Sequence, residues 1–390
     1  MSLITDSVAL AEFCAGLARA DFITVDTEFM REKTYWPVLC LVQIAGPESA
    51  AAIDPLAPGL DLAPVLRLMT DARVLKVFHA ARQDVEIFVH MTGTVPVPLF
   101  DTQVAAMVCG FGESASYETL AAKLAGATID KSSRFTDWSH RPLSERQLQY
   151  ALADVVPLRK VYERLAARLD KSGRASWVAD QMAQLRDPKT YRNDPAEAWR
   201  RLKPRTQSRR TLALVRELAA WREAAAQKRD VPRNRLVRDE ALLEIAAHPP
   251  RNVEDLARMR AFGRSLAEGR IGTEILAVVE RARTLPESAW PELPAQHKLP
   301  AGIGPVVDLM RVLLRLVAEE NDVAPRLIAD NDDLEAIAAD DNAAVRALSG
   351  WRAEIFGRDA LDLKHGRLAL TAAGTRIERL HLGPTAAAAQ

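Results

Sequence analysis

Strand-like segments end about a third of the way along this chain, and this limits the folds that the sequence can adopt. In the N-terminal third, runs rich in β-branched and aromatic residues lie at 22–29, 38–45, 50–56, 74–80 and 97–101. The first three runs are joined by short connections, which predicts an antiparallel meander. The later runs alternate with helical spacing at 62–72 and 81–91, which predicts parallel strands added through helical crossovers. The sequence therefore begins with a predicted mixed α/β sheet.

Beyond Tyr117 the patterns are helical. One helix is expected between a Ser116 cap and the stop signal Gly126, and a longer helix is expected to start after Pro142. Residues 170–207 are polar and basic, and residues 285–305 contain five prolines without periodicity, which is typical of a stiff linker. Helical patterns continue to about Leu380. We predict these boundaries: an α/β domain at 1–169, a linker at 170–207, a helical domain at 208–284, a linker at 285–305, a second helical domain at 306–382 and a disordered tail at 383–390.

An internal repeat relates the two helical regions. Residues 214–246 can be aligned with residues 308–338. Each has a helix, an Asp-Val turn leading to proline, an apolar step and a second helix that contains LLEIA or LEAIA. The alignment predicts two copies of one small helical module. Chance similarity between Ala-, Leu- and Arg-rich helices is the alternative.

The formal net charge of zero conceals a segregation of charge. Residues 1–150 carry 12 Lys+Arg and 18 Asp+Glu, residues 151–300 carry 30 and 20, and residues 301–390 carry 10 and 14. A basic middle between acidic ends suggests that one segment meets a polyanion. Solvated faces of Arg-rich helices account for the composition equally well.

The composition excludes several other classes. No stretch approaches the roughly 18 apolar residues of a membrane span. The N-terminus lacks a basic lead, so we expect no secretory signal. The three widely spaced cysteines (Cys14, Cys40 and Cys109) argue against a disulfide framework or a cysteine zinc cluster and favour a cytoplasmic protein.

Acidic residues recur at positions suited to a site. Asp26 and Glu28 are two apart in a predicted strand and share one face, which is costly in a core unless the pair holds cations. Asp84 lies in the first turn of a helix that follows a buried strand, where α/β sheets open onto ligand crevices. Tyr150 and Asp154 share one helix face. Taken singly, an exposed strand end, a helix-dipole acid and a structural Tyr–Asp contact explain them.

Together the four carboxylates and the phenol favour a metal-dependent phosphoryl-transfer site. Hard divalent ions prefer sites made of oxygen ligands. A carboxylate-rich site with two ions stabilises both the attacking and the leaving oxygen of an in-line displacement. The sequence has no Walker loop, dinucleotide-binding glycine pattern, G-x-S-x-G or H-E-x-x-H to suggest another chemistry.

Three short motifs then resemble a known family. VDTEF, HAARQD and YALAD, in this order and spacing, are similar to the three motifs of the DEDD 3′–5′ exonucleases. The fuller stretch VDTEFMREKTYWPVLCLVQIA resembles the ribonuclease D family in particular, as does the linker-like AWRRLK at 198–203. The repeated helical module resembles HRDC domains, present twice as in that family. The resemblance covers nearly the whole chain.

The resemblance carries expectations about fold, site and activity. It implies an RNase H-like exonuclease fold for 1–169, followed by two all-α HRDC domains. It implies that Asp26, Glu28, Asp84 and Asp154 bind two divalent ions, Mg²⁺ or Mn²⁺. Tyr150 would mark the tyrosine subtype, because Gln149 stands where the histidine subtype has its histidine. Because the ordinary pKa of tyrosine is about 10, we expect the Tyr150 hydroxyl to orient the attacking water. The implied activity is the release of 5′-mononucleotides in tRNA 3′ processing and RNA turnover.

Substrate contacts are expected in two places. Thr27 and Phe29 flank the acidic pair, and their backbone or the Phe29 ring is predicted to meet the terminal nucleotide, although Phe29 is as readily a core residue. The basic middle is predicted to contact RNA phosphates, or alternatively to pair with acids and hold the domains together. Its residues are Arg205, Arg209, Arg210, Arg233 and Arg235, with Lys228, Arg229 and Arg238. We expect a monomer that binds RNA and no membrane, and the acidic second HRDC copy leaves its own role open.

Two other functions remain at this point. A DNA exonuclease of the Werner or proofreading type would use the same carboxylates, but the tandem HRDC modules and the MREKTYWP stretch argue against it. A non-catalytic RNA-binding protein on a decayed nuclease fold is the third possibility. The presence of all five motif residues argues against that.

Overall fold

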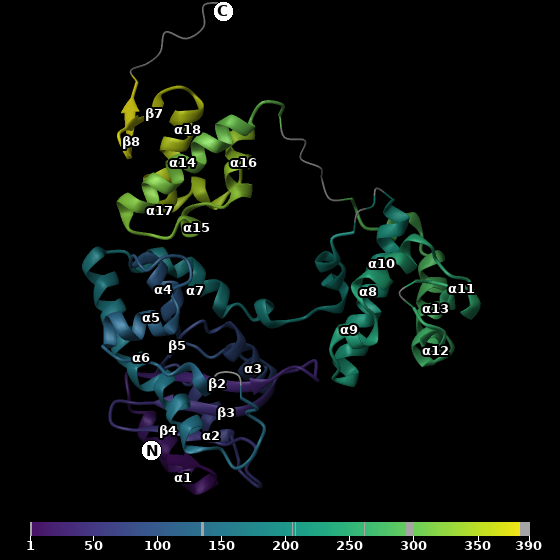
Figure 1. Cartoon of the computed structure of the whole chain (residues 1–390), viewed down its shortest axis with the longest axis horizontal. Helices are drawn as coiled ribbons and strands as arrows, with labels where there is room; N and C mark the ends of the chain where they lie inside the picture. Colours follow the sequence, from purple (N-terminus) through teal and green to yellow (C-terminus); the bar gives the residue numbers. More distant parts are fainter. Residues whose placement is uncertain are drawn as a thin grey trace, which may run out of the picture.

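The computed structural model describes residues 2–133, 136–204, 206, 208–260, 262–293 and 300–382. Figure 1 shows an α/β domain, a helical module built around α8 and a second helical module built around α14. The predicted disordered tail at 383–390 and part of the predicted proline-rich linker lie outside the described residues.

A six-stranded mixed sheet forms the α/β domain. Its strand order is β1-β4-β3-β2-β5-β6. β2, β3 and β4 pair antiparallel, and β5 and β6 continue the sheet parallel to β2, which confirms the predicted meander and crossovers. β1 was not predicted because three residues carry too little pattern; it pairs parallel with β4. The strands are β1 (Ser2–Ile4), β2 (Phe22–Met30), β3 (Val38–Ala45), β4 (Ala50–Ile53), β5 (Leu75–Phe78) and β6 (Leu99–Asp101).

Helices cover both faces of this sheet. On one face, Ile23 and Val25 of β2 share an apolar cluster with residues of α1, α2 and α3. On the other face, α6 packs through Leu152 and Val155 against Leu41 of β3. Each such buried side chain contributes about 1.5–3 kcal/mol through the hydrophobic effect. The helices are α1 (Ser7–Leu17), α2 (Ala63–Thr70), α3 (Arg82–Thr92), α4 (Thr102–Val108), α5 (Tyr117–Leu120), η1 (Ala121–Ala125), η2 (Lys131–Ser133) and α6 (Glu145–Ser172).

The predicted linker after α6 is folded: most of it packs on the α/β domain, and its last helix, at 195–202, packs in the core of the first helical module. Met182 and Tyr191 are buried in the two main apolar clusters of that domain. Polar, basic composition concealed this, because only isolated apolar residues anchor the segment. Its short helices are η3 (Ala175–Val178), α7 (Ala179–Arg186), η4 (Pro188–Tyr191) and η5 (Pro195–Leu202).

The first helical module has its own core, which includes Leu214, Leu242 and Ile275. It is α-helical as predicted. Its helices are α8 (Arg209–Arg229), α9 (Arg233–Leu236), α10 (Asp239–Ala247), α11 (Val253–Ala257), α12 (Arg264–Glu268) and α13 (Arg270–Arg283), followed by η6 (Glu287–Ala289).

The second helical module ends in a β-hairpin, so the prediction of an all-α domain with helix to about Leu380 was wrong there. The Ala- and Leu-rich composition suggested helix, but Gly374 adopts a left-handed φ of 66° and turns the chain between two paired strands. The elements are α14 (Gly304–Asn321), α15 (Pro325–Ile328), α16 (Asn331–Ala339), η7 (Arg346–Leu348), α17 (Gly350–Arg352), η8 (Ala353–Gly357), α18 (Arg358–Lys364), β7 (Leu368–Ala373) and β8 (Arg376–His381).

Both modules contain the predicted Asp-Val turn in the same backbone form. Asp230 ends α8 with φ 48°, and Asp322 ends α14 with φ 54°. Both are left-handed conformations, which are uncommon outside glycine. In each module a single-turn helix and then a nine-residue helix follow. This agreement supports the internal repeat.

The two modules contact the α/β domain differently. The second module shares a continuous apolar core with it, in which Met310 and Leu313 lie with Leu158 of α6. Trp177 also stacks on Trp351, with ring centroids 4.2 Å apart. The first module makes a smaller cluster, formed by Tyr35, Ala226 and Leu236. Among the described residues, no helix combines the length and the apolar character that crossing a membrane requires.

Candidate active site

Three of the predicted carboxylates meet at one point. Ligand oxygens of Asp26, Glu28 and Asp154 all lie within 4.8 Å of one another. Asp26 and Glu28 share a face of β2 because they are two residues apart. Asp154 comes from α6, whose backbone is tied to β2 by the Thr24 hydroxyl, which donates to the Val155 carbonyl oxygen at 2.8 Å. This hydrogen bond holds α6 beside β2, so Asp154 lies next to Asp26 and Glu28.

Tyr150 lies in the same place, as predicted from its spacing to Asp154. A pocket of about 400 Å³ is lined by Asp26, Tyr150 and Asp154, together with residues of the β5–α3 and α4–α5 connections. The start of α6 is fixed by Ser144, whose hydroxyl accepts from the backbone N–H of Gln147 in a capping box. The helix thus presents the phenol and the carboxylate one turn apart.

Asp84 approaches the acidic group from a different direction and is not one of its three members. The Thr27 hydroxyl donates to Asp84 at 2.5 Å. Thr27 alternates with Asp26 and Glu28 along β2, so its side chain points to the opposite face of the strand. The Thr27 side chain thus bonds Asp84, and the expected contact of its backbone with the nucleotide stays a prediction.

Asp101 is a further buried acid, and it supports the start of α3. Asp101 is buried and accepts from the backbone N–H groups of Ala80 at 3.0 Å and Ala81 at 2.9 Å. Ala80 has a φ of 59°, a strained conformation for a residue with a side chain. The two hydrogen bonds hold this turn and, through it, the first turn of α3 that carries Asp84. Sequence reasoning missed Asp101 because its partners are set by the β5–β6 pairing.

Burial raises the proton affinity of two of the carboxylates. Burial raises the pKa of Asp26 to about 6. Burial and the negative charge of Asp26 raise the pKa of Asp84 well above its ordinary value. Buried acids that must share a site in ionised form are unfavourable without a cation. The donor set is oxygen only, which fits Mg²⁺ or Mn²⁺ and does not fit a thiolate- or imidazole-bound zinc.

Gln43 is a buried polar neighbour that the sequence analysis missed. It stands directly opposite Asp26 in the β2–β3 ladder, so both side chains point to the same face. Its side chain is fully buried, and neither amide atom has a hydrogen-bond partner among the described residues. Register between strands cannot be read from the sequence, so the pairing gave no signal there.

His79 and Tyr117 also line the pocket and were not predicted. The His79 ring nitrogen Nδ1 lies 3.0 Å from the Thr102 hydroxyl. Burial lowers the pKa of His79, so its imidazole is neutral at pH 7. The Tyr117 hydroxyl donates to the Ala153 carbonyl oxygen at 2.8 Å, one residue before Asp154. The sequence does carry a signal for His79, because this residue is the first of the HAARQD motif.

Phe29 is half-buried and belongs to no apolar cluster of the described residues. The β2–β3 register shifts between Glu28 and Phe29. Such an irregularity redirects a side chain relative to regular pleating. This weakens the alternative that Phe29 is a core residue.

The predicted RNA-binding arginines fall into two groups. Arg209, Arg229 and Arg233 are half-buried and pair with Glu292, Glu274 and Glu223 respectively. The second group is exposed and forms no ion pair with any described residue: Arg210, Lys228, Arg235 and Arg238. Arg205 lies outside the described residues.

Known proteins resemble this chain along almost its full length. The sequence matches the 3′–5′ exonuclease family over residues 1–170 and the HRDC domain family over residues 211–279. Ribonuclease D of Granulibacter bethesdensis is 51% identical over 383 residues, covering 98% of this chain and 97% of the relative. Ribonuclease D of Acidiphilium cryptum is 52% identical over 383 residues, covering 97% of each.

The chain belongs to the ribonuclease D family. The crystal structure of Escherichia coli RNase D, described as an exoribonuclease involved in structured RNA processing, superimposes with a TM-score of 0.81 at 31% identity. It covers 94% of this chain and 98% of that one. The expected family, the RNase H-like exonuclease fold with its mixed sheet and the exoribonuclease activity are thereby confirmed.

Membership of the ribonuclease D family also bears on the finer predictions. The DEDD exonucleases depend on divalent metal, and the acidic group of this chain is suited to one. The HRDC match covers the first helical module alone, so the second copy stays a prediction. The tyrosine subtype, the individual site residues and the domain boundaries are likewise predictions.

Proposed function

We propose that this chain removes nucleotides one at a time from RNA 3′ ends and releases 5′-mononucleotides. We further propose that tRNA precursors with 3′ extensions are among its substrates and that it acts as a cytoplasmic monomer. The observation that carries the proposal is the meeting of Asp26, Glu28 and Asp154 within 4.8 Å. Tyr150 lines the same pocket, and the ribonuclease D relatives are similar over nearly the whole chain.

The carboxylates would hold two divalent ions, Mg²⁺ or Mn²⁺. Asp26, Glu28 and Asp154 are the central ligands in this proposal, and Asp84 supplies a further oxygen from the start of α3. Bound divalent ions would lower the pKa of a water molecule and neutralise negative charge at the phosphodiester. Thr27 and Asp101 keep Asp84 in place through the hydrogen bonds described above.

Tyr150 acts on the water in this proposal. Its hydroxyl lies on the pocket wall one helical turn before Asp154. A phenol there can donate or accept one hydrogen bond and so orient the attacking oxygen. We also propose that the half-buried ring of Phe29, directly after Glu28, stacks on the terminal base, a contact that tolerates any sequence.

The exposed basic residues of the first module are the proposed phosphate contacts. Arg210, Lys228, Arg235 and Arg238 remain available because no described acid neutralises them. Arg209 and Arg229 hold the module together through their carboxylate partners. The earlier proposal for Arg205, which lies outside the described residues, stands on sequence alone.

One experiment tests the activity and its main competitor. A 3′-extended tRNA and a single-stranded DNA of matched length are incubated with the protein in Mg²⁺, Mn²⁺ or EDTA. We expect stepwise shortening of the RNA, with mononucleotide products, in either metal and none in EDTA. Equal or faster degradation of DNA would favour the DNA exonuclease, and no degradation of either would favour a non-catalytic RNA-binding protein.

A further inference from the structure

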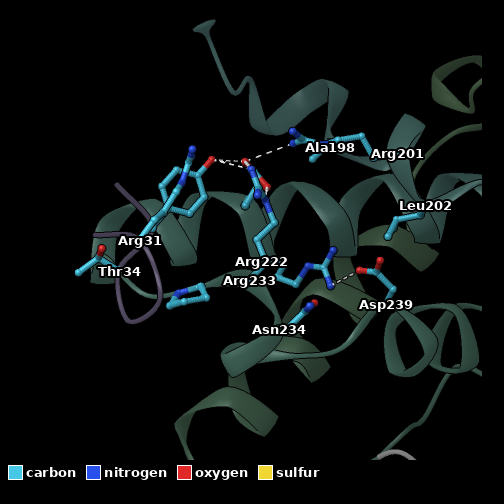
Figure 2. A pocket seen from close by; sticks show the side chains of 12 residues that line it. Arg31, Thr34, Ala198, Arg201, Leu202, Arg222, Arg233, Asn234 and Asp239 are labelled. Carbon is cyan, nitrogen blue, oxygen red and sulfur yellow. Dashed lines mark hydrogen bonds and ion pairs between the residues drawn. The ribbon is translucent and has the colours of Figure 1, made fainter. Parts of the chain in front are cut away.

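A pocket of about 390 Å³ lies away from the acidic site, between the α/β domain and the first helical module. Its wall comes from the β2–β3 connection, from η5 and from α8 to α10 (Figure 2). Four arginines line it: Arg31, Arg201, Arg222 and Arg233. Nothing in the proposed mechanism uses this pocket.

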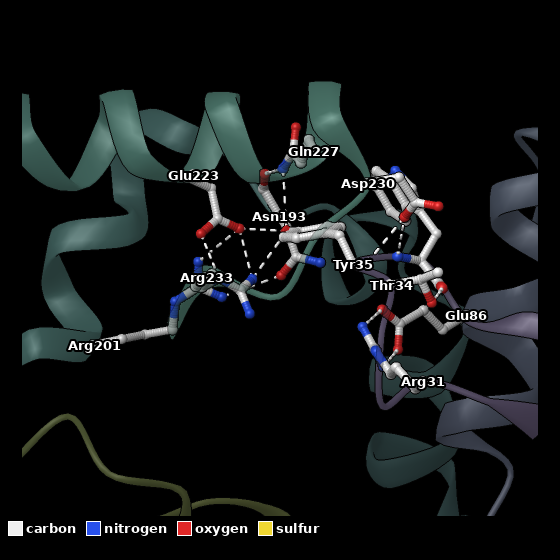
Figure 3. Close-up of polar contacts among 11 residues, drawn as sticks. Arg31, Thr34, Tyr35, Glu86, Asn193, Arg201, Glu223, Gln227, Asp230 and Arg233 are labelled. Carbon is white, nitrogen blue, oxygen red and sulfur yellow. Dashed lines mark hydrogen bonds and ion pairs between the residues drawn. The ribbon is translucent and has the colours of Figure 1, made fainter. Parts of the chain in front are cut away.

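Among the described residues, the arginines around the pocket outnumber the acids paired with them by one. Glu223 is paired with both Arg233 at 2.5 Å and Arg201 at 3.2 Å, so one carboxylate faces two guanidinium groups (Figure 3). Burial raises the pKa of Glu223, but hydrogen bonds from Arg233 and Tyr35 outweigh it and hold the pKa below its ordinary value. Glu223 is therefore ionised at neutral pH and carries a single charge.

The other two arginines are each balanced by one acid. Arg31 makes a two-pronged contact with Glu86, with both nitrogen–oxygen distances 2.8 Å. Arg222 pairs with Asp239 at 2.7 Å. Four guanidinium groups thus meet three carboxylates, and Arg201 is the most exposed, with half of its side-chain surface accessible.

Arg222 is the most deeply buried of the four arginines. Its residue is 5% exposed, and it lines the pocket. Its terminal nitrogen donates to the Val237 carbonyl oxygen at 2.8 Å, but its buried Nε–H has no partner among the described residues. A buried donor without a partner costs about 1–3 kcal/mol, so such a group calls for an explanation. Because protein atoms enclose this Nε, a ligand in the pocket does not reach it, and Arg222 contributes to the pocket through its charge and its place on the wall.

We propose that this pocket binds a phosphate of the RNA strand, upstream of the nucleotide that is cleaved. Guanidinium groups match phosphate oxygens in number and geometry. Arg31 follows Glu28 by three residues and is the first residue after β2, so the pocket wall begins within about 10 Å of the acidic group along the chain. That separation suits a backbone phosphate near the 3′ end. The inference rests on the proposed exoribonuclease activity.

The first helical module completes this site. Arg222 and Arg233 belong to the module, whereas Arg31 belongs to the α/β domain. Tyr35 connects the α/β domain to the module, because its hydroxyl donates a hydrogen bond to Glu223 and accepts one from Arg233 at 2.9 Å. An RNA strand bound here would contact both the α/β domain and the first helical module, so its binding would depend on how the two are docked.

The test uses the full chain with Arg201→Gln. This side chain is half exposed, and Glu223 keeps Arg233 and Tyr35 when it is replaced, so folding should be retained. The matched control is Arg264→Gln, which removes an exposed arginine of the first helical module whose acid partner is Glu268. Unchanged melting temperatures verify the fold of both variants.

Two readouts are measured for each protein: the salt dependence of binding to single-stranded RNA, and kcat/KM for a long oligonucleotide relative to a dinucleotide. Loss of one phosphate contact should reduce the slope of log K against log salt by about 0.7. We expect this reduction in Arg201→Gln, with a severalfold lower long-to-short ratio, and neither change in Arg264→Gln.

The outcomes separate the site from the activity. If the protein degrades RNA but Arg201→Gln matches the wild type in slope and ratio, the phosphate site is wrong and the proposed function stands. Equal losses in Arg201→Gln and Arg264→Gln would also overturn it, since a general charge effect would then suffice. If the wild type degrades no RNA at all, the proposed function itself fails.

Discussion

At the scale of single residues, the acidic site is held together by hydrogen bonds from side chains that bear no charge. Thr27 fixes Asp84 from the opposite face of β2, and Thr24 ties that strand to α6. A carboxylate that is oriented by a neighbour keeps its oxygen where a cation needs it, and loss of such support commonly costs 10–100-fold in metal affinity or activity.

The first prediction concerns Asp26, which lies in the acidic group and lines the pocket. Asp26→Asn should abolish turnover, because it removes a charge while keeping the shape, and RNA binding should change little. Saturating Mg²⁺ should raise the melting temperature of the wild type through ligand linkage, by an amount that shrinks in the variant. Near-normal degradation by Asp26→Asn would refute the assignment of the site.

The second prediction concerns Thr27. Thr27→Val keeps the branched shape but deletes the donor to Asp84. We expect kcat/KM to fall about 10–100-fold, with a higher Mg²⁺ concentration needed for half-maximal rate. Thr27→Ser restores a hydroxyl and should recover most of the rate. A fully active Thr27→Val would mean that Asp84 holds its position without this bond.

The third prediction concerns Tyr150. Tyr150→Phe should lower kcat by about 10²–10⁴-fold, the range typical of proton-transfer and orienting groups. The rise in melting temperature caused by Mg²⁺ should persist, because no carboxylate is lost. Rate and Mg²⁺ titrations on the same preparation would check both parts. If kcat were unchanged, the phenol would serve packing against Trp138, whose ring lies 6.0 Å away.

At the scale of elements, residue spacing correctly predicted which side chains share a face of one strand or one helix. The i, i+2 pair on β2 and the i, i+4 pair on α6 gave the faces of Asp26, Glu28, Tyr150 and Asp154 correctly, because these periodicities are properties of one element. Gln43 was missed because its place depends on register with another strand.

Two elements were misjudged for a related reason. The C-terminal hairpin was taken for helix because Ala and Leu dominate it, whereas strand pairing around Gly374 determined the outcome. The segment 170–207 was taken for a linker because its composition is polar. Its few apolar side chains, such as Met182, find partners on the α/β domain that the sequence alone does not specify.

The fourth prediction concerns β5, which carries a fully buried lysine. Lys76 donates to the carbonyl oxygens of Asp71 at 2.8 Å and Val97 at 2.7 Å, and burial lowers its pKa to about 8. The ordinary lysine pKa is about 10.4, so between pH 8 and 10.4 the unfolded chain binds more protons than the folded one. Stability contributed by this group therefore rises with pH across that window.

The variant Lys76→Met lacks this titrating amine, so comparing its stability with that of the wild type isolates the pH dependence caused by Lys76. The free energy of unfolding of the wild type, relative to the variant, should increase between pH 8 and about 10.4, by about 1.4 kcal/mol for each unit of pKa shift. Urea denaturation of both proteins at several pH values measures the difference and cancels other titrations. A difference that stays constant with pH would show that Lys76 keeps an ordinary pKa.

At the scale of the whole molecule, both helical modules use the same turn to contact the α/β domain. The Asp230 carboxylate accepts from the backbone N–H groups of Tyr35 and Trp36, each at 3.0 Å (Figure 3). Asp322 lies against Gly110, where a side chain would collide with it, and Ala324 donates to the Met107 carbonyl oxygen at 2.9 Å. The two helical modules thus use equivalent turns to dock on different surfaces of the α/β domain.

The second docking surface is the larger one, and this affects how the modules can be tested. Met310 and Leu313 share a core with Leu158, so cutting the chain after η5 would expose apolar surface of the α/β domain. Loss of RNA binding in such a truncation could then reflect misfolding. Point substitutions in the full chain separate docking from folding more cleanly.

The fifth prediction follows from the Asp230 turn. Asp230→Gly suits the left-handed φ of 48° and keeps the backbone cap of α8, whose N–H bonds Ala226, while it removes the acceptor for Tyr35 and Trp36. Hydrogen bonds to charged groups contribute about 1.5–3 kcal/mol, so exchange of these two amides should accelerate roughly 10–100-fold with little change in the melting temperature.

Asp322→Gly is the matched control, because it makes the same replacement at the other turn and should leave the exchange of the Tyr35 and Trp36 amides unchanged. Hydrogen exchange followed by mass spectrometry on peptides that span the β2–β3 connection measures both variants. Because Tyr35 also lines the arginine pocket, Asp230→Gly should reduce the preference for long over short RNA as well. Unchanged amide exchange in Asp230→Gly would show that the apolar contacts of Tyr35 with Ala226 and Leu236 hold the first module in place without the aspartate.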